Sequence, residues 1–186
     1  MSWIREPAPL PINPVAVPGT GGIIGMAPCP GKVLMDGLAR DRDQDLEADL
    51  GTIRDWGAQA IVTLMEAHEL ETCRIASLPD RVPAGIRHFH LPIPDGGIPD
   101  ADWERDWQRA GPAIRALLER GGKVLVHCLG GLGRTGTVSA RLLVEFGLAP
   151  EQAMLAVRAA RRGAIENSLQ EGYVRRQRPL PPHTTA

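Results

Sequence analysis

Residues 123–137 combine an apolar run, one cysteine, and a glycine-rich loop that ends in an arginine and a threonine. Residues 124–126 predict a short buried strand, and apolar residues recur at helical spacing from Val138 to Phe146. The glycines therefore join a strand to a helix N-terminus. Such a junction binds anions, because its free backbone N–H groups point at the bound oxygens and the helix dipole adds about half a positive charge.

Cys128 lies at the end of this predicted strand and is the candidate nucleophile. A free thiol has a pKa of about 8.5, and a helix N-terminus with nearby cations lowers it to between about 3.5 and 7.5. Arg134 carries a planar guanidinium that suits two phosphoryl oxygens at once. The Thr135 hydroxyl is a candidate donor to the departing thiolate. This order of residues predicts a thiolate that attacks a phosphate ester.

Three other interpretations of the segment are weaker. A lone cysteine after a strand is often an inert buried residue, but the neighbours of Cys128 favour the nucleophile. Residues 131–136 match the dinucleotide pattern G-x-G-x-x-G. That pattern needs a further strand with an acidic residue about 20 positions later, whereas residues 150–157 are typical of a helix beginning. The Walker phosphate loop lacks its Gly-Lys-Ser/Thr.

Residues 127–136, His-Cys-Leu-Gly-Gly-Leu-Gly-Arg-Thr-Gly, resemble the signature loop of the cysteine-dependent protein tyrosine and dual-specificity phosphatases. Residues 90–100, His-Leu-Pro-Ile-Pro-Asp-Gly-Gly-Ile-Pro-Asp, are similar to the acid loop of the cyclin-dependent kinase inhibitor 3 (kinase-associated phosphatase) subgroup. The likeness extends from about Gly22 to Val174. It implies a hydrolase that acts on phosphotyrosine and on phosphoserine or phosphothreonine through a phosphocysteine intermediate, with no cofactor and no metal.

The resemblance also implies roles for single residues. His127 orients the loop through hydrogen bonds, and Gln170 is the candidate for positioning water in the second step. Glu166 stands where the subgroup often has a glutamine, which leaves that step open. The residues implied to bind the substrate phosphate are Leu129, Gly130, Gly131, Leu132, Gly133 and Arg134.

A general acid must protonate the leaving group when the thiolate attacks phosphorus, and the same group can later take a proton from water. Asp95 is our candidate, since it lies between Pro94 and two glycines in the loop that resembles the acid loop. Asp100 is the rival. It directly precedes a helical pattern, which favours a helix N-cap.

Several other polar and aromatic residues have simpler interpretations. We interpret His88 and His90 as surface or hydrogen-bonded residues, because no carboxylate or cysteine completes a metal set at ligand spacing. Trp103 and Trp107 predict the buried stripe of a helix. The Arg-Arg-Gly at 161–163 suits either a basic rim of the site or the end of a helix with a glycine cap, and we favour the helix end.

Strand and helix patterns alternate along the chain. Strands are predicted at residues 15–17, 22–26, 32–35, 60–64 and 87–91, and helices at 43–56 and 101–120. Pro112 is expected to kink or divide the second helix. The alternation predicts an α/β fold with a mostly parallel sheet flanked by helices, and the resemblance implies the three-layer protein tyrosine phosphatase-like fold with its site at the C-terminal ends of the strands.

The 186 residues fit one folded domain. We expect a proline-rich arm at residues 1–20, a dual-specificity phosphatase-like catalytic domain at 21–176 and a flexible tail at 177–186. The 21 basic and 22 acidic residues create no overall field that would attract nucleic acid or a membrane.

Three cysteines without framework spacing indicate a reducing compartment. No apolar run is long enough to span a bilayer, and the first residues lack the pattern of a signal peptide, so we expect a cytoplasmic protein. We expect it to be a monomer.

The expected substrate is a phosphoprotein or phosphopeptide. Residues 129–132 contain no lysine, which disfavours inositol phosphates, and nothing resembles the loop that builds a deep phosphotyrosine slot. Two alternatives stay open. One is a phosphatase of a small molecule or nucleotide, and the other is a catalytically weak phosphate-binding module, for which we would expect a lost nucleophile or acid.

Overall fold

The computed structural model of the chain describes residues 8–32 and 45–181. Its strands are β1 (Asn13–Ala16), β2 (Ile23–Ala27), β3 (Ala58–Thr63), β4 (Arg87–His90) and β5 (Lys123–His127). Its helices are α1 (Leu46–Trp56), α2 (Ala67–Thr72), α3 (Leu78–Arg81), α4 (Ala101–Glu119), α5 (Gly133–Glu145), α6 (Pro150–Ala160) and α7 (Ser168–Arg175). Within these described ranges, no helix has both the length and the apolar composition that a membrane crossing requires.

The strands form one sheet in the order β1-β2-β5-β3-β4. β5 lies at its centre and pairs in parallel with both β2 and β3, and β3 also pairs in parallel with β4. Only the edge strand β1 runs antiparallel, to β2. The C-terminal ends of the four parallel strands therefore meet at one edge, where ligands bind in open α/β sheets.

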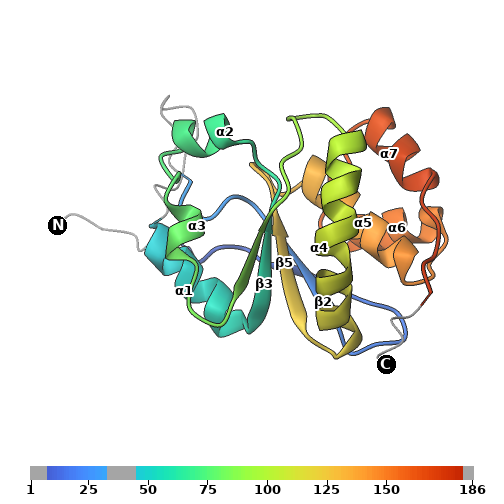
Figure 1. The fold of residues 1–186 in the computed structure, drawn as a ribbon, viewed down its shortest axis with the longest axis horizontal. Coiled ribbons are helices and arrows are strands. Elements are labelled where there is room, and N and C mark those ends of the chain that lie inside the picture. Colours follow the sequence, from blue (N-terminus) through green and yellow to red (C-terminus); the bar gives the residue numbers. More distant parts are fainter. Residues whose placement is uncertain (1–7, 33–44, 182–186) are drawn as a thin grey trace.

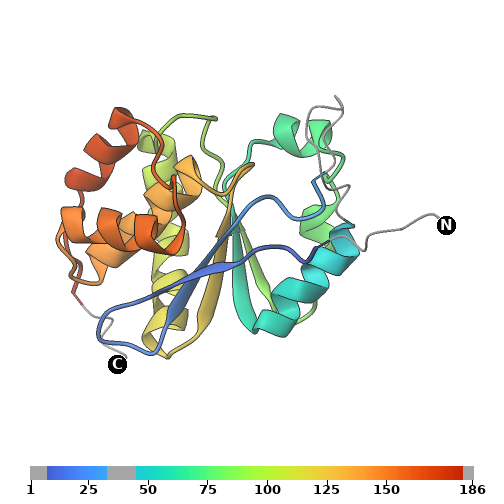
Figure 2. The same cartoon turned by 180° about the vertical axis from the view of Figure 1, so that it is seen from behind.

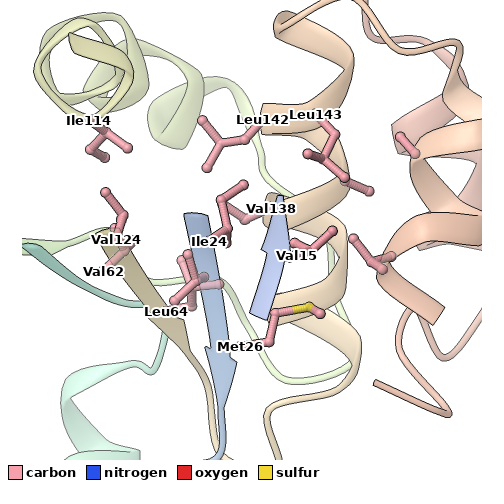
Figure 3. Packing of buried hydrophobic residues seen from close by; sticks show 14 of the residues in the cluster. Val15, Ile24, Met26, Val62, Leu64, Ile114, Val124, Val138, Leu142 and Leu143 are labelled. Atoms are coloured by element: carbon pink, nitrogen blue, oxygen red, sulfur yellow. The ribbon is translucent and has the colours of Figure 1, made fainter. Parts of the chain in front are cut away.

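Helices cover both faces of this sheet (Figures 1 and 2). α1, α2 and α3 lie on one side, and α4, α5, α6 and α7 lie on the other. Successive side chains of a strand point to opposite faces, and β5 follows this rule. Val124 and Val126 join the core under α4 and α5, whereas Leu125 joins the smaller core under α1. Figure 3 shows the larger core, where Ile24 and Val124 of the sheet lie close to Leu142 and Ile114 of the helices. The three-layer α/β fold expected from the sequence is confirmed.

Most of the expected elements are present, with two corrections. α4 runs without interruption through Pro112, so of the two effects expected from this proline, a kink or a division of the helix, the division is wrong. The described part of the expected N-terminal arm includes β1, which is hydrogen-bonded into the sheet. The strand expected at 32–35 and the start of the helix expected at 43 fall largely outside the described residues. Gly57, with φ of 91°, ends α1 as expected.

Candidate active site

Cys128 follows β5 directly and lies at a cavity of about 330 Å³ at the C-terminal edge of the sheet. Its side chain is buried, with 3% of the residue exposed. The cavity is lined by Lys32, Asp95, Gly96, Cys128, Leu129, Gly130, Leu132, Gly133, Arg134 and Glu166. The structure therefore places the candidate nucleophile, the candidate acid and the loop arginine around one space.

The loop between β5 and α5 has the conformation of an anion cradle. None of the backbone N–H groups of residues 129–133 has a hydrogen-bond partner in the described part of the chain. The Leu129 carbonyl accepts from the Cys29 N–H at 3.1 Å. Gly131 has φ of 69°, and a Cβ there would lie 2.4 Å from the Ala27 backbone, so only glycine fits. With α5 beginning at Gly133, the free N–H groups and the helix dipole meet at the cavity.

Arg161, at the end of α6, holds the outer side of this loop. Its Nε donates to the Gly131 carbonyl at 2.5 Å, its Nη2 to the Gly130 carbonyl at 2.8 Å, and its Nη1 to Asn13 Oδ1 at 2.7 Å. Burial lowers the pKa of Arg161, while the nearby Cys128 opposes that change. Arg161 is at the helix end that the favoured sequence interpretation expects, but its side chain also supports the loop of the site, which that interpretation left out.

Arg134 is the second residue of α5 and is almost fully buried. Its Nη1 and Nη2 donate to Glu69 Oε2 and Oε1 at 2.7 and 2.8 Å, a bidentate pair that fixes the guanidinium plane. Nη1 also donates to the Ile93 carbonyl at 2.9 Å, and Nη2 lies 3.0 Å from Asp95 Oδ1. Burial raises the pKa of Glu69, but the hydrogen bonds from Arg134 and from the Glu66 backbone, together with the charge of Arg134, outweigh burial and lower the pKa overall.

Glu69 is a site residue that the sequence interpretation missed. It is the third residue of the short helix α2 and forms a capping box with Glu66. The available signal was the Glu-x-x-Glu spacing directly after the buried strand β3, which predicts a helix start. Nothing in that spacing indicates a partner 65 residues further along the chain.

Asp95 and Asp100 occupy different environments. The Asp95 side chain is 72% exposed, lines the cavity, and lies in a turn closed by the Gly97 N–H donating to the Pro94 carbonyl at 2.9 Å. The Asp100 side chain accepts from the Trp103 N–H at 2.8 Å and caps α4. The expected N-cap is thus in place, and of the two carboxylates Asp95 is the one at the cavity.

His127, the last residue of β5, is fully buried. Its Nε2 lies 2.8 Å from Thr63 Oγ1, and the same hydroxyl lies 2.8 Å from His88 Nε2. A hydroxyl donates one proton, so one imidazole accepts and the other donates. Burial lowers the pKa of His127 to about 3 and that of His88 to about 4, with His90 contributing to the latter. His127 therefore enters the site as a neutral hydrogen-bonded group.

Thr135 and Gln170 are buried, and neither belongs to the lining of the cavity. The Thr135 hydroxyl has no hydrogen-bond partner among the described residues, so the structure does not include the expected bond to the Cys128 sulfur. Gln170 Oε1 accepts from the Glu166 N–H at 2.8 Å. Glu166 lines the cavity, and its Oε2 would lie 2.1 Å from a Cβ at Gly133. A carboxylate thus lies next to the first residue of α5.

The two histidines of β4 are hydrogen-bonded. His90 Nε2 lies 2.7 Å from the Met65 carbonyl oxygen, and His88 bonds Thr63 as described above. In the described segments, no group of three or more histidine, cysteine, aspartate or glutamate side chains is arranged to hold a metal ion.

Comparison with known proteins agrees with this geometry. Residues 37–148 match a family model described as a polymorphic toxin system DSP-PTPase phosphatase. The chain is 33% identical over 141 residues to rat (Rattus norvegicus) cyclin-dependent kinase inhibitor 3, covering 73% of this chain and 64% of the relative. It is 38% identical over 95 residues to mouse (Mus musculus) protein tyrosine phosphatase type IVA 3, covering 51% and 54%. The chain therefore spans somewhat less than two thirds of the length of these curated relatives.

A solved structure of kinase-associated phosphatase, in which the catalytic-site cysteine is replaced by serine, superimposes with a TM-score of 0.80 at 28% identity. The match covers 91% of this chain and 94% of that one. A structure of Tk-PTP in the active form matches with a TM-score of 0.59 at 27% identity, covering 87% and 93%. On the family model, the relatives and the fold together, this chain belongs to the DSP-PTPase family, the dual-specificity branch of the protein tyrosine phosphatases.

Proposed function

We propose that the protein hydrolyses phosphotyrosine and phosphoserine or phosphothreonine in phosphoproteins through a cysteinyl-phosphate intermediate. The observation that carries this proposal is the placement of Cys128, Arg134 and Asp95 around one cavity whose loop N–H groups are unpaired within the described chain. Membership of the DSP-PTPase family supports the same activity.

The first step forms the bond between Cys128 Sγ and phosphorus. As the bond from phosphorus to the leaving oxygen breaks, the Asp95 carboxyl donates a proton to that oxygen. The loop N–H groups and the fork of Arg134 bind the equatorial oxygens, where negative charge is concentrated. Glu69 keeps that fork in one plane throughout.

The second step breaks the sulfur–phosphorus bond. Water attacks phosphorus, the ionised Asp95 accepts its proton, and inorganic phosphate leaves together with the regenerated thiolate. Gln170 and Glu166 are the candidates for orienting this water, because both lie against Gly133 at the start of α5.

The charges at the cavity favour substrates with a single phosphate. Lys32 and Arg134 contribute two positive charges to the lining, and Asp95 and Glu166 contribute two negative ones, so the lining has no excess of positive charge. A polyanionic inositol phosphate would bring further negative charge toward these carboxylates. We further propose that the protein acts as a monomer in the cytoplasm, where its three free cysteines would stay reduced.

Turnover on a panel of phosphotyrosine, phosphoserine and phosphothreonine peptides, with phosphoinositides and nucleotides alongside, tests the substrate class. Cys128→Ser should abolish hydrolysis but retain phosphopeptide binding, because the cradle and Arg134 remain. Faster turnover of a nucleotide or phosphoinositide than of any peptide would replace the proposed substrate.

Two aspartate variants test the acid. Asp95→Asn should lower turnover of phosphoserine peptides by about 10²–10⁴-fold, and much less for an aryl phosphate whose leaving group departs without a proton. Asp100→Asn is the matched control, since asparagine caps a helix about as well as aspartate. A larger loss of turnover in Asp100→Asn than in Asp95→Asn would assign the general acid to Asp100.

A further inference from the structure

The turn that carries Asp95 has little support of its own. Residues 94–96 are exposed, and the turn is held by two local hydrogen bonds, from the Gly97 N–H to the Pro94 carbonyl and from the Gly96 N–H to Asp95 Oδ1 at 3.1 Å. Gly96, with φ of 69°, occupies the third position, where a type II turn requires a positive φ. A turn rich in glycine samples many conformations, so the position of the whole turn, and with it the Asp95 carboxyl, relative to the cavity depends on contacts from outside the turn.

One outside contact comes from the loop arginine. Arg134 Nη2 lies 3.0 Å from Asp95 Oδ1, on the side of the turn that faces the phosphate cradle. This arginine must also bind the substrate phosphate, so its contact with Asp95 is shared with the ligand. A contact that is independent of the substrate is therefore needed to hold the turn during turnover.

Asn167 supplies such a contact with one side chain. Its Nδ2 donates to the Gly96 carbonyl at 2.9 Å, while its Oδ1 accepts from the Gln170 N–H at 3.0 Å and caps α7. The two ends of one carboxamide thus join the helix to the residue that follows Asp95. Gln170 Nε2 also points at the Gly97 carbonyl, but at 3.4 Å this contact is longer than a normal hydrogen bond.

α7 is a firm support for this contact. Tyr173 and Val174 on its inner face are buried in the larger core, and the helix packs against α5 and α6. Glu171 accepts from Arg158 of α6 at 2.7 Å. Asn167 therefore connects an exposed turn to a helix that is fixed by the core.

We propose that Asn167 is a positioning residue that holds the Pro94–Gly97 turn so that the Asp95 carboxyl faces the leaving oxygen. This inference deepens the proposed function and rests on it for the kinetic effect. The acceptor end of the amide serves the helix, and the donor end serves the acid turn.

Two substitutions separate these two ends. Asn167→Ser and Asn167→Asp both keep an N-cap acceptor for α7, but both remove the amide N–H that reaches Gly96. Serine adds no charge, and aspartate is close in shape to asparagine. A loss of kcat that both variants share therefore reports the missing N–H donor. Misplacement of a catalytic group by 1 Å costs up to about 10²-fold, and we expect kcat on phosphoserine peptides to fall by about 10- to 100-fold in both variants.

Substrate dependence distinguishes positioning from a general structural effect. The same variants should keep nearly wild-type kcat on p-nitrophenyl phosphate, whose leaving group needs no proton. In an Asp95→Asn background, Asn167→Ser should cause no further loss of kcat on phosphoserine peptides, because the effects of substituting residues that act as one unit are not additive. An equal loss on both substrates, or a full additional loss in the double variant, would overturn the proposal.

Hydrogen exchange provides a readout that does not depend on activity. The Gly97 amide, which donates within the turn, should exchange faster in Asn167→Ser than in the wild type. If the wild type hydrolyses no phosphomonoester, the proposed function fails, and exchange alone then decides whether Asn167 holds the turn. Unchanged amide exchange at residues 95–97 in both variants would overturn the positioning role.

Discussion

At the scale of single residues, burial of Arg134 determines how the arginine that we propose for phosphate binding is held. Arg134 is 2% exposed, and removing a guanidinium from water costs several kcal/mol unless partners replace the lost hydration. Glu69 and the Ile93 carbonyl are those partners. Their contacts also fix the direction of the guanidinium, so the group is oriented before a phosphate arrives.

This arrangement predicts a large effect of a small change at Glu69. Glu69→Gln retains the shape but replaces a carboxylate that accepts two hydrogen bonds with a neutral amide that accepts at one atom only. Breaking a buried pair costs about 3–5 kcal/mol when one charge is left uncompensated, and we expect both a lower free energy of unfolding and at least about tenfold lower kcat/KM. Glu66→Gln is the matched control at the same helix start. Equal behaviour of the two variants in urea unfolding and in turnover would contradict this role.

The residues that could be predicted are those whose chemistry is local. Cys128 and Arg134 belong to one continuous segment, where glycines and a helix start define an anion site without knowledge of the rest of the chain. Glu69 and Arg161 support that same segment from 65 and 30 residues away along the chain. Such pairings depend on how strands are ordered in the sheet, and no local pattern contains that information.

At the scale of elements, α4 explains why a proline failed to divide a helix. Its buried stripe includes Trp103, Trp107, Ile114 and Leu118. Pro112 lies on the opposite, exposed face, so the carbonyl that loses its N–H partner can be hydrated by water. Burial of the apolar stripe outweighs the missing hydrogen bond, and the sequence expectation considered only the bond.

This account predicts that Pro112→Ala stabilises the protein. An alanine restores the helical N–H, and proline is up to about 3 kcal/mol less favourable than alanine in a helix interior. The gain is reduced by about 0.4–1 kcal/mol, because proline also restricts the unfolded chain. Pro150→Ala is the control, because proline is favourable at the first position of α6. If Pro112→Ala raises the midpoint of thermal unfolding no more than Pro150→Ala does, this explanation is contradicted.

At the scale of the whole molecule, the central position of β5 links the site to the fold. β5 lies between β2 and β3, so the loop after it opens at the middle of the parallel edge, where a cavity can be lined from both sides. Alternating strands and helices predicted a parallel sheet. The order of its strands was not predictable, because neither neighbour of the central strand, β2 or β3, is adjacent to β5 in sequence, and long-range packing decides these pairings.

Burial of histidines in this sheet predicts how stability depends on pH. His127 has a folded-state pKa of about 3 and His88 of about 4, against 6.5 for an unperturbed histidine. Near pH 5 the unfolded chain therefore binds close to two more protons than the folded protein, and each of them changes the free energy of unfolding by about 1.4 kcal/mol per pH unit. The free energy of unfolding should be highest above pH 6.5 and fall as the pH falls.

Urea unfolding between pH 5 and 6 isolates the contribution of the histidines. Glu69, whose pKa is lowered from 4.5, reduces the free energy of unfolding only at lower pH. Between pH 5 and 6, His127→Gln should reduce the slope of the free energy of unfolding against pH by the equivalent of about one proton. His68→Gln is the control, because this side chain is 71% exposed, and it should leave the slope unchanged. A wild-type slope in His127→Gln would mean that this imidazole is protonated in the folded sheet.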